Sequence, residues 1–203
     1  IRNFKGDGVV VRDEPSTTIG ACSSDGRWNR LVSNGGYGLR VTGESADNTV
    51  AAINQIGVVG AVAAGNALGG ILVENGADST TIGCQNWLGN LIAANAGPGV
   101  TLRGADTSVV TFFRTVIGQP GLGNGGDGIL VDGASDVTNA RSTVSPLLIT
   151  SNGGDGIRVA DGSLVRFDFA SASSAPSDRA ACELNGGLAV NLLARSLIVI
   201  SRH

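Results

Sequence analysis

One short motif recurs along the chain about every thirty residues. It has the form N-x-x-x-G followed by alternating apolar residues, as in NGGYGLRV from Asn34 and NGGDGIRV from Asn152. The glycines before each apolar run fall at positions 8, 38, 70, 99, 128 and 156, which gives steps of 30, 32, 29, 29 and 28 residues. Each repeat also holds two more short β-like runs, such as STTIG and NRLVSN in the first. Three strands per repeat predict a solenoid of about six to seven stacked coils.

The apolar positions of the motif form two columns. Side chains alternate across a strand, so the residues one and three after each glycine share a face. Every residue in these columns is Val, Ile or Leu, whereas the residue between them is mixed, as expected for an outward position. We therefore expect a continuous aliphatic core. Its first column is Val9, Leu39, Ile71, Val100, Ile129 and Ile157, and its second is Val11, Val41, Val73, Leu102, Val131 and Val159.

An asparagine lies four residues before each glycine position from the second repeat onward. Stacking the coils places these asparagines above one another at a turn, where each side-chain amide can bond to the next. We interpret them as a structural ladder rather than as catalytic residues. The ladder comprises Asn34, Asn66, Asn95, Asn124, Asn152 and Asn185.

Other solenoids fit the repeat less well. A leucine-rich repeat requires L-x-x-L-x-L, which is absent, and the sixfold period of left-handed hexapeptide helices is not found. The calcium-binding nonapeptide G-G-x-G-x-D is approached by GGDGILVDG from Gly125, but Leu130 stands where the aspartate is required. The high glycine content, 32 residues of 203, is typical of a turn-dense all-β protein.

Two stretches, STTIGACSSDGRWNRLVSNGGYGLRV and DSTTIGCQNWLGNLIAANAGPGVTL, resemble the NTIGG…NVISGN repeats of a large bacterial family of right-handed parallel β-helices that includes pectate-lyase-like proteins. The resemblance covers about residues 6–162. It implies an all-β, right-handed parallel β-helix with three sheets, and a secreted or cell-surface location. It implies little about activity, because the family includes enzymes, adhesins and spacers.

The division of the chain follows the repeat. Residues 1–162 are predicted to form regular coils, and residues 163–203 a terminal coil of the same domain that caps the core or mediates self-association. The motif is already complete by Val11, so we expect the chain to be a mature or excised piece of a longer protein. Neither a signal peptide nor an apolar run of membrane-spanning length is found. The net charge of −3 argues against a nucleic-acid partner.

The cysteines and the single histidine limit the chemistry. Cys22 and Cys84 are predicted to lie two coils apart, about 10 Å along the axis, which exceeds the limit of about 7 Å for a disulfide. We therefore expect Cys22, Cys84 and Cys182 to be free, mostly buried thiols. No Cys or His cluster suggests a metal site, and His203 is the only histidine, so no zinc centre or His-based triad is expected.

Several polar residues are candidates for a site on one outer sheet. Asp127 and Asp155 would stack in consecutive coils, where two like carboxylates could perturb each other's pKa or hold a calcium ion. The same aspartates also suit ordinary GGDG turns. The catalytic candidates are Asp127, Asp132, Asp155, Asp161 and Arg158, with Arg40 and Arg103 on the same sheet, and the candidate sugar-stacking aromatics are Trp28, Tyr37 and Trp87.

The motifs of the enzymes in such families are missing. The sequence lacks N-T-D with D-D and H-G of polygalacturonases, R-x-P-x-x-R of pectate lyases and D-P-H-E of alginate epimerases. We therefore predict a non-catalytic structural or adhesive module that contacts polysaccharide or a cell-surface glycan and needs no cofactor. The alternatives are a polysaccharide lyase or hydrolase, and a trimeric phage-like spike in which the C-terminal segment forms the interface.

Overall fold

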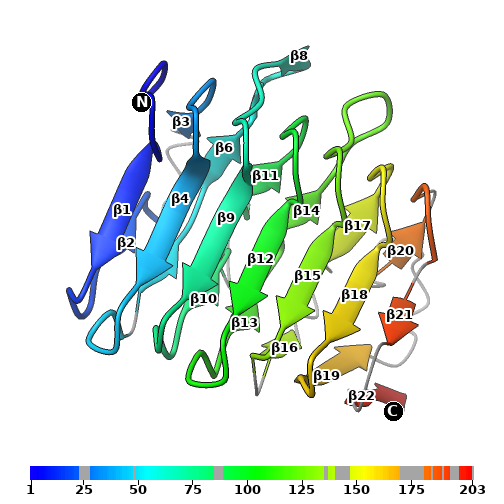
Figure 1. The fold of residues 1–203 in the computed structure, drawn as a ribbon. Coiled ribbons are helices and arrows are strands. Elements are labelled where there is room, and N and C mark those ends of the chain that lie inside the picture. The colour runs from blue at the N-terminus through cyan, green and yellow to red at the C-terminus, as the bar shows by residue number, and fades with distance from the viewer. Residues whose placement is uncertain are drawn as a thin grey trace.

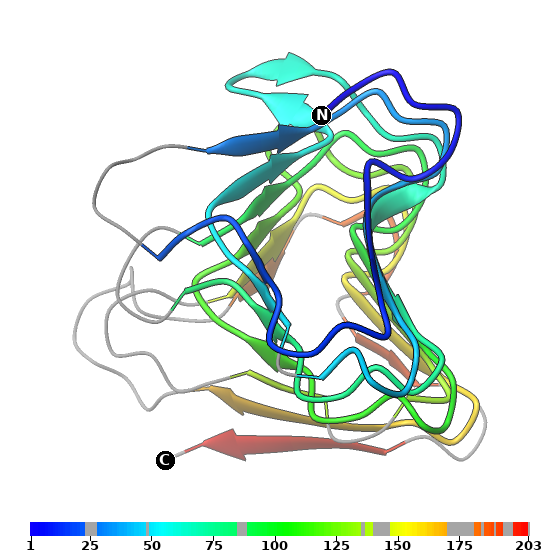
Figure 2. The same cartoon turned by 90° about the vertical axis from the view of Figure 1, so that its left-hand side faces the viewer.

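The computed structural model shows the chain as a right-handed parallel β-helix (Figure 1). It describes residues 1–22, 28–47, 49–84, 89–134, 137–139, 147–169, 181–183, 185–188, 190–192 and 197–202. Three sheets surround one interior, and the chain passes through them in turn in each coil (Figure 2). Within these residues there is no helix that could cross a membrane.

The strands of the first and second sheets pair in parallel, each with its counterpart one coil away. In order, the first sheet contains β1 (Val9–Arg12), β4 (Tyr37–Thr42), β9 (Gly69–Glu74), β12 (Val100–Arg103), β15 (Ile129–Asp132), β18 (Ile157–Ala160) and β21 (Val190–Leu192). The second contains β2 (Thr18–Ile19), β5 (Val50–Ala51), β10 (Thr81–Ile82), β13 (Thr111–Phe112), β16 (Val137–Asn139), β19 (Leu164–Phe169) and β22 (Leu197–Arg202).

The third sheet has the same parallel pattern. It contains β3 (Asn29–Leu31), β6 (Asn54–Ile56), β11 (Leu91–Ile92), β14 (Val116–Ile117), β17 (Leu148–Thr150) and β20 (Ala181–Glu183). A small antiparallel hairpin, β7 (Val58–Val59) and β8 (Val62–Ala63), projects beyond this sheet (Figure 1). Beyond residue 163, where the motif weakens, β19 to β22 extend all three sheets in parallel register.

The two predicted apolar columns form the core, as expected. Val41, Val73, Leu102 and Val131 pair in register across successive strands, and each is fully buried. The third sheet adds a parallel column of buried residues, among them Leu31, Ile56, Ile92, Ile117 and Ile149. Burying one such side chain stabilises the fold by about 1.5–3 kcal/mol.

The outward column differs from expectation at two of its positions. Leu72 is only 3% exposed to solvent and Thr101 only 1%. Both lie in the middle strands, and Leu72 stands directly opposite Arg40 in register, so neighbouring side chains of the same outer face cover them. The outside of the first sheet is therefore partly closed over by its own side chains.

The six asparagines form a continuous hydrogen-bonded ladder. At each step, the side-chain oxygen of one asparagine accepts the backbone N–H and the side-chain amide of the asparagine one coil earlier. For Asn66 and Asn95 these distances are 3.1 and 2.9 Å. In Asn66, Asn95, Asn124 and Asn152 the remaining amide hydrogen goes to a backbone carbonyl of the previous coil, as Asn95 Nδ2 does to Ile56. The buried side chains of the ladder are thus satisfied by hydrogen bonds to the coils on either side.

A second, shorter ladder lies at the start of the third-sheet strands. Asn90 Oδ1 accepts the backbone N–H and Nδ2 of Asn54, each at 3.0 Å. One coil on, Thr115 holds the corresponding position and donates its hydroxyl to the Ile82 carbonyl at 3.2 Å. Sequence analysis did not identify this ladder, although the strings NQI, NLI and TVI carry its spacing.

Cys22 and Cys84 form a disulfide, so the prediction that they are free thiols was wrong. Their Cα atoms lie 5.8 Å apart. The coil between them passes from β5 to β6 through Ala52 and Ile53 alone, whereas its neighbours have longer segments there. The two cysteines therefore meet across the short turn, a bend that strand spacing alone does not reveal. Cys182 pairs in register with Ile149, and its side chain lies outside the described residues.

Candidate functional site

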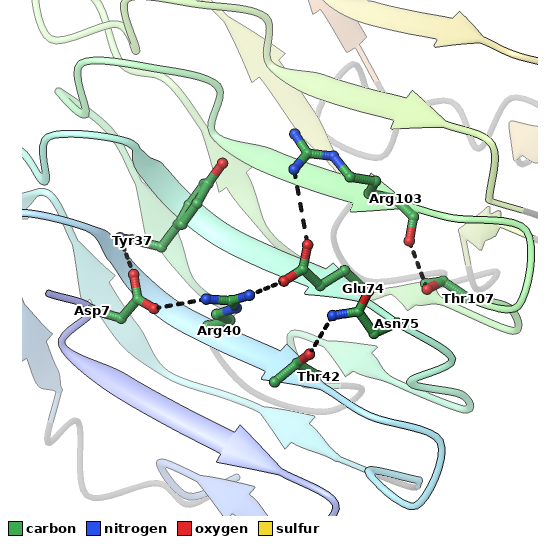
Figure 3. A network of polar contacts seen from close by, with 8 residues as sticks. All are labelled: Asp7, Tyr37, Arg40, Thr42, Glu74, Asn75, Arg103 and Thr107. Carbon is green, nitrogen blue, oxygen red and sulfur yellow. Dashed lines mark hydrogen bonds and ion pairs between the residues drawn. The ribbon is translucent and has the colours of Figure 1, made fainter.

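The outer face of the first sheet carries a band of alternating charges. We define this band as Asp7, Arg40, Glu74, Arg103 and Asp132, which come from the start of the first coil and from β4, β9, β12 and β15. Arg40 donates to Glu74 through Nη2, and its Nη1 lies 3.7 Å from Asp7 Oδ2 (Figure 3). Arg103 approaches Glu74 and Asp132 at 3.9 Å each. The charges therefore run along the helix axis, from coil to coil.

Glu74 is the centre of the band, and sequence analysis missed it. Its side chain is only 8% exposed and contacts both Arg40 and Arg103. Two cations beside a buried carboxylate offset the cost of removing it from water. Aligning the repeats would have revealed this residue. The position four residues after the glycine of the repeat is charged in three successive coils, as Glu74, Arg103 and Asp132.

Asp127 and Asp155 both accept backbone hydrogen bonds from the next coil. Asp127 Oδ1 accepts the N–H of Asp155 at 2.8 Å, and Asp155 Oδ1 accepts the N–H of Leu188 at 2.7 Å. Asp7 does the same for the N–H of Tyr37 at 2.7 Å (Figure 3). These carboxylates join successive turns in the manner of the asparagine ladder, which agrees with their interpretation as turn residues.

Two carboxyl groups on this face have raised pKa values. Burial raises the pKa of Asp127, and the Asp155 N–H and Arg158 oppose that shift. Arg158 Nη1 lies 3.9 Å from Asp127 Oδ2. Burial also raises the pKa of Asp132, and a hydrogen bond and charge repulsion from Asp161 raise it further. A neighbouring carboxyl group therefore contributes to both shifts: Asp155 is the smallest cause of the raised pKa of Asp127, and Asp161 is a cause of the raised pKa of Asp132.

The two described aromatic candidates, Tyr37 and Trp28, do not form one platform. Tyr37 is half-buried on β4, and its ring lies against Gly69 of the next coil, where a Cβ would come within 2.8 Å of Tyr37 Cε1. Trp28 is half-buried just before β3, in a different sheet. Trp87 lies outside the described residues. Tyr37 is thus the one described aromatic candidate beside the charged band (Figure 3).

The chemistry available on this face is polar recognition and proton exchange. Among the described residues, no group of three or more His, Cys, Asp or Glu side chains could hold a metal ion. Buried polar atoms without hydrogen-bond partners include Arg40 Nε and Thr101 Oγ1, both on the first sheet. Arg158 interacts with two of the aspartates on this face. It forms an ion pair with Asp127, and its charge lowers the pKa of Asp132. The face could therefore present both donors and acceptors to a ligand.

Comparison with known proteins supports the fold alone. No family model matches the sequence, and no curated protein matches it. Among solved structures, a mutant of the periplasmic alginate epimerase AlgG is similar, with a TM-score of 0.54 and 15% sequence identity. The match covers 95% of this chain and 47% of that one, so the chain spans about half the length of the solved structure.

Proposed function

We propose that the chain is a non-catalytic β-helix module with a structural or adhesive role, and that the outer face of its first sheet contacts carbohydrate. One observation carries the proposal: three carboxylates of this face, those of Glu74, Asp127 and Asp155, are already used to join the coils. Glu74 is clasped by two arginines, and Asp127 and Asp155 accept backbone hydrogen bonds.

A catalytic carboxylate must reach a proton on the substrate. Asp127 Oδ1 is occupied by the Asp155 N–H, and Asp127 Oδ2 faces Arg158. Moving this side chain toward a substrate would leave a backbone N–H without a partner, at a cost of about 1–3 kcal/mol. Such a residue is better suited to fixing the coil than to proton transfer.

The composition of the face supports contact with carbohydrate. The arginines of the band present guanidinium donors, which suit hydroxyl or carboxylate oxygens of a glycan. Tyr37 adds an aromatic ring beside them, and aromatic rings commonly offer apolar surface next to a polar group in binding sites. A disulfide is typical of proteins that mature outside the reducing cytosol, which supports a secreted or cell-surface location.

The binding half of the proposal can be tested with a matched pair of variants. Affinity electrophoresis against alginate, polygalacturonate and a neutral glucan should show retardation by at least one glycan. Arg103→Gln should weaken that binding by about fivefold, the size expected for one partly exposed charge. Arg30→Gln, on the exposed outside of the third sheet, is the control and should bind as the wild type does. Equal binding by both variants would refute this face as the contact surface.

The catalytic half requires an assay for each reaction class. Absorbance of unsaturated products detects a lyase, reducing ends detect a hydrolase, and proton NMR of the uronate residues detects an epimerase. We expect no turnover in any of them. Turnover that is lost in Asp127→Asn, which keeps an oxygen for the Asp155 N–H, would overturn the non-catalytic proposal.

One observation favours a second candidate, a polysaccharide lyase or hydrolase. A general acid needs a pKa above the usual carboxyl value, and Asp132 has such a shift and a second carboxyl beside it in Asp161. If the enzyme assays are positive, Asp132→Asn is the variant that should abolish turnover. Loss of activity in Asp132→Asn with Asp127→Asn unaffected would select this candidate.

A further inference from the structure

The Cys22–Cys84 disulfide joins two coils that are not neighbours. The coil between them, which contains β5 and β6, contributes only Ala52 and Ile53 at this corner. The segments between β2 and β3 and between β10 and β11 are longer, at residues 20–28 and 83–90. The bond therefore crosses over a whole coil and closes a loop with a sequence separation of 62 residues.

We propose that this disulfide is a redox-sensitive staple, which ties residues 20–22 to residues 83–84 at the corner between the second and third sheets and releases them on reduction while the coils stay stacked. The staple lies between the second and third sheets, whereas the proposed carbohydrate contact is on the first sheet, so the two can be tested independently.

The staple forms by thiol–disulfide exchange with an external disulfide, such as that of a thiol oxidase or a small-molecule disulfide. The Cys22 and Cys84 thiols lose two protons and two electrons as their sulfurs bond, and the external disulfide is reduced to two thiols. Atoms and electrons balance without a metal or another cofactor.

The two cysteine residues differ in exposure, so an external thiolate is expected to reach one of them first. Cys22 is exposed, whereas Cys84 retains 3% of its exposed surface. An external thiolate therefore attacks Cys22 Sγ, forms a mixed disulfide there, and displaces Cys84 as a thiolate. The trapped intermediate is expected on Cys22 and not on Cys84.

The coils beneath the staple have supports of their own. Ala51 and Ile82 are fully buried in parallel register, and the Asn54–Asn90 ladder lies at the same corner. None of these contacts involves a cysteine. Reduction should therefore loosen the backbone around Cys22 and Cys84 and lower the thermal stability, without unfolding the sheets at room temperature.

Thiol counting is the first test. Protein purified without reductant and then denatured should show one reactive thiol, that of Cys182, and a peptide map should link the Cys22 and Cys84 peptides. Reaction with glutathione followed by acid quenching should place the mixed disulfide on Cys22. Three reactive thiols in the unreduced protein, or a mixed disulfide only on Cys84, would overturn the proposal.

Thermal melts then separate the staple from other effects of reductant. Dithiothreitol should lower the Tm of the wild type and of Cys182→Ser by on the order of 10 °C, given the long loop closed by the bond. The double variant Cys22→Ser/Cys84→Ser should melt at the reduced value with or without reductant. A reductant effect of equal size in the double variant would contradict the proposal, as would increased amide exchange throughout the sheets rather than around Cys22 and Cys84.

Discussion

Replacing Asn95 by alanine tests the asparagine ladder at its most connected position. The side chain takes part in five hydrogen bonds, two that Oδ1 accepts from Asn66 and three that Nδ2 donates. Asn95 is 1% exposed, so water cannot replace these partners without entering the structure. The substitution removes the whole set and leaves the backbone of residue 95 in place.

The expected loss in the free energy of unfolding depends on which buried groups lose every hydrogen-bond partner. The Ile56 carbonyl still accepts the N–H of Ala93, and Asn124 Oδ1 still accepts the backbone N–H of residue 95. The backbone N–H and one amide hydrogen of Asn66 are left unpaired, and the Ala93 carbonyl loses the bond from Asn95. Two buried donors at about 1–3 kcal/mol each give a loss of about 4 kcal/mol in the free energy of unfolding. For a chain of this size, that loss lowers the Tm by about 10 °C.

The measurement is thermal and denaturant unfolding followed by circular dichroism, with Asn29→Ala as the matched control. Asn29 starts the strand of the first coil in the third sheet and is exposed, so its replacement should cost less than about 0.5 kcal/mol. A second variant, Asn95→Asp, keeps an acceptor for Asn66 and loses the donor to Asn124. It should be destabilised at neutral pH and recover as the pH falls, because the protonated acid can donate again. Equal costs for Asn95→Ala and Asn29→Ala would refute the ladder's role in stability.

Two further substitutions probe the coil contacts and the carboxyl pair. In Gly99→Ala, the new Cβ would lie 2.4 Å from Ile117 Cγ2, so we expect a loss of about 1–3 kcal/mol in unfolding experiments. Gly6→Ala, where no atom lies within 4 Å, is the control, and an equal loss in both would contradict the close packing. Because the pKa of Asp132 is raised, the folded state binds the proton of this carboxyl group more tightly than the unfolded state does. The stability that this proton contributes is present below pH 3.8, the ordinary pKa of Asp, and is lost as the pH rises through the folded-state pKa. Asp132→Asn should therefore unfold with a weaker pH dependence, and at neutral pH should equal or exceed the wild type by up to about 1 kcal/mol. If the free energy of unfolding depends on pH in the same way in Asp132→Asn as in the wild type, Asp132 does not cause that dependence.

The parts of the fold that repeat could be predicted from sequence. The spacing of Val41, Val73 and Leu102 determines both the face and the register of their strands, because a one-residue slip would turn every apolar side chain outward. The same spacing aligns the asparagines. The similarity of the chain to a solved β-helix agrees with this part of the prediction.

The features that the repeat does not encode were missed. The Cys22–Cys84 bond depends on a short turn in the coil between them, and an average distance per coil cannot express that local change. Glu74 replaces Thr42 of the previous coil at the same register position, so it stands out only once the strands are aligned. Irregular turns and single substitutions within a column are therefore where sequence reasoning was weakest.

Spacing along the stack tests the central claim most directly, namely that each repeat forms one coil of a parallel β-helix. Val10, Leu130 and Arg158 share one outward column, in which Val10 lies four coils from Leu130 and five from Arg158. In a background with the three cysteines replaced by serine, spin-label pairs at Val10 and Leu130 and at Val10 and Arg158 should give pulsed-EPR distances near 19 and 24 Å, at about 4.8 Å per coil. Equal distances for the two pairs, or a shorter distance for the second, would contradict the stacked arrangement.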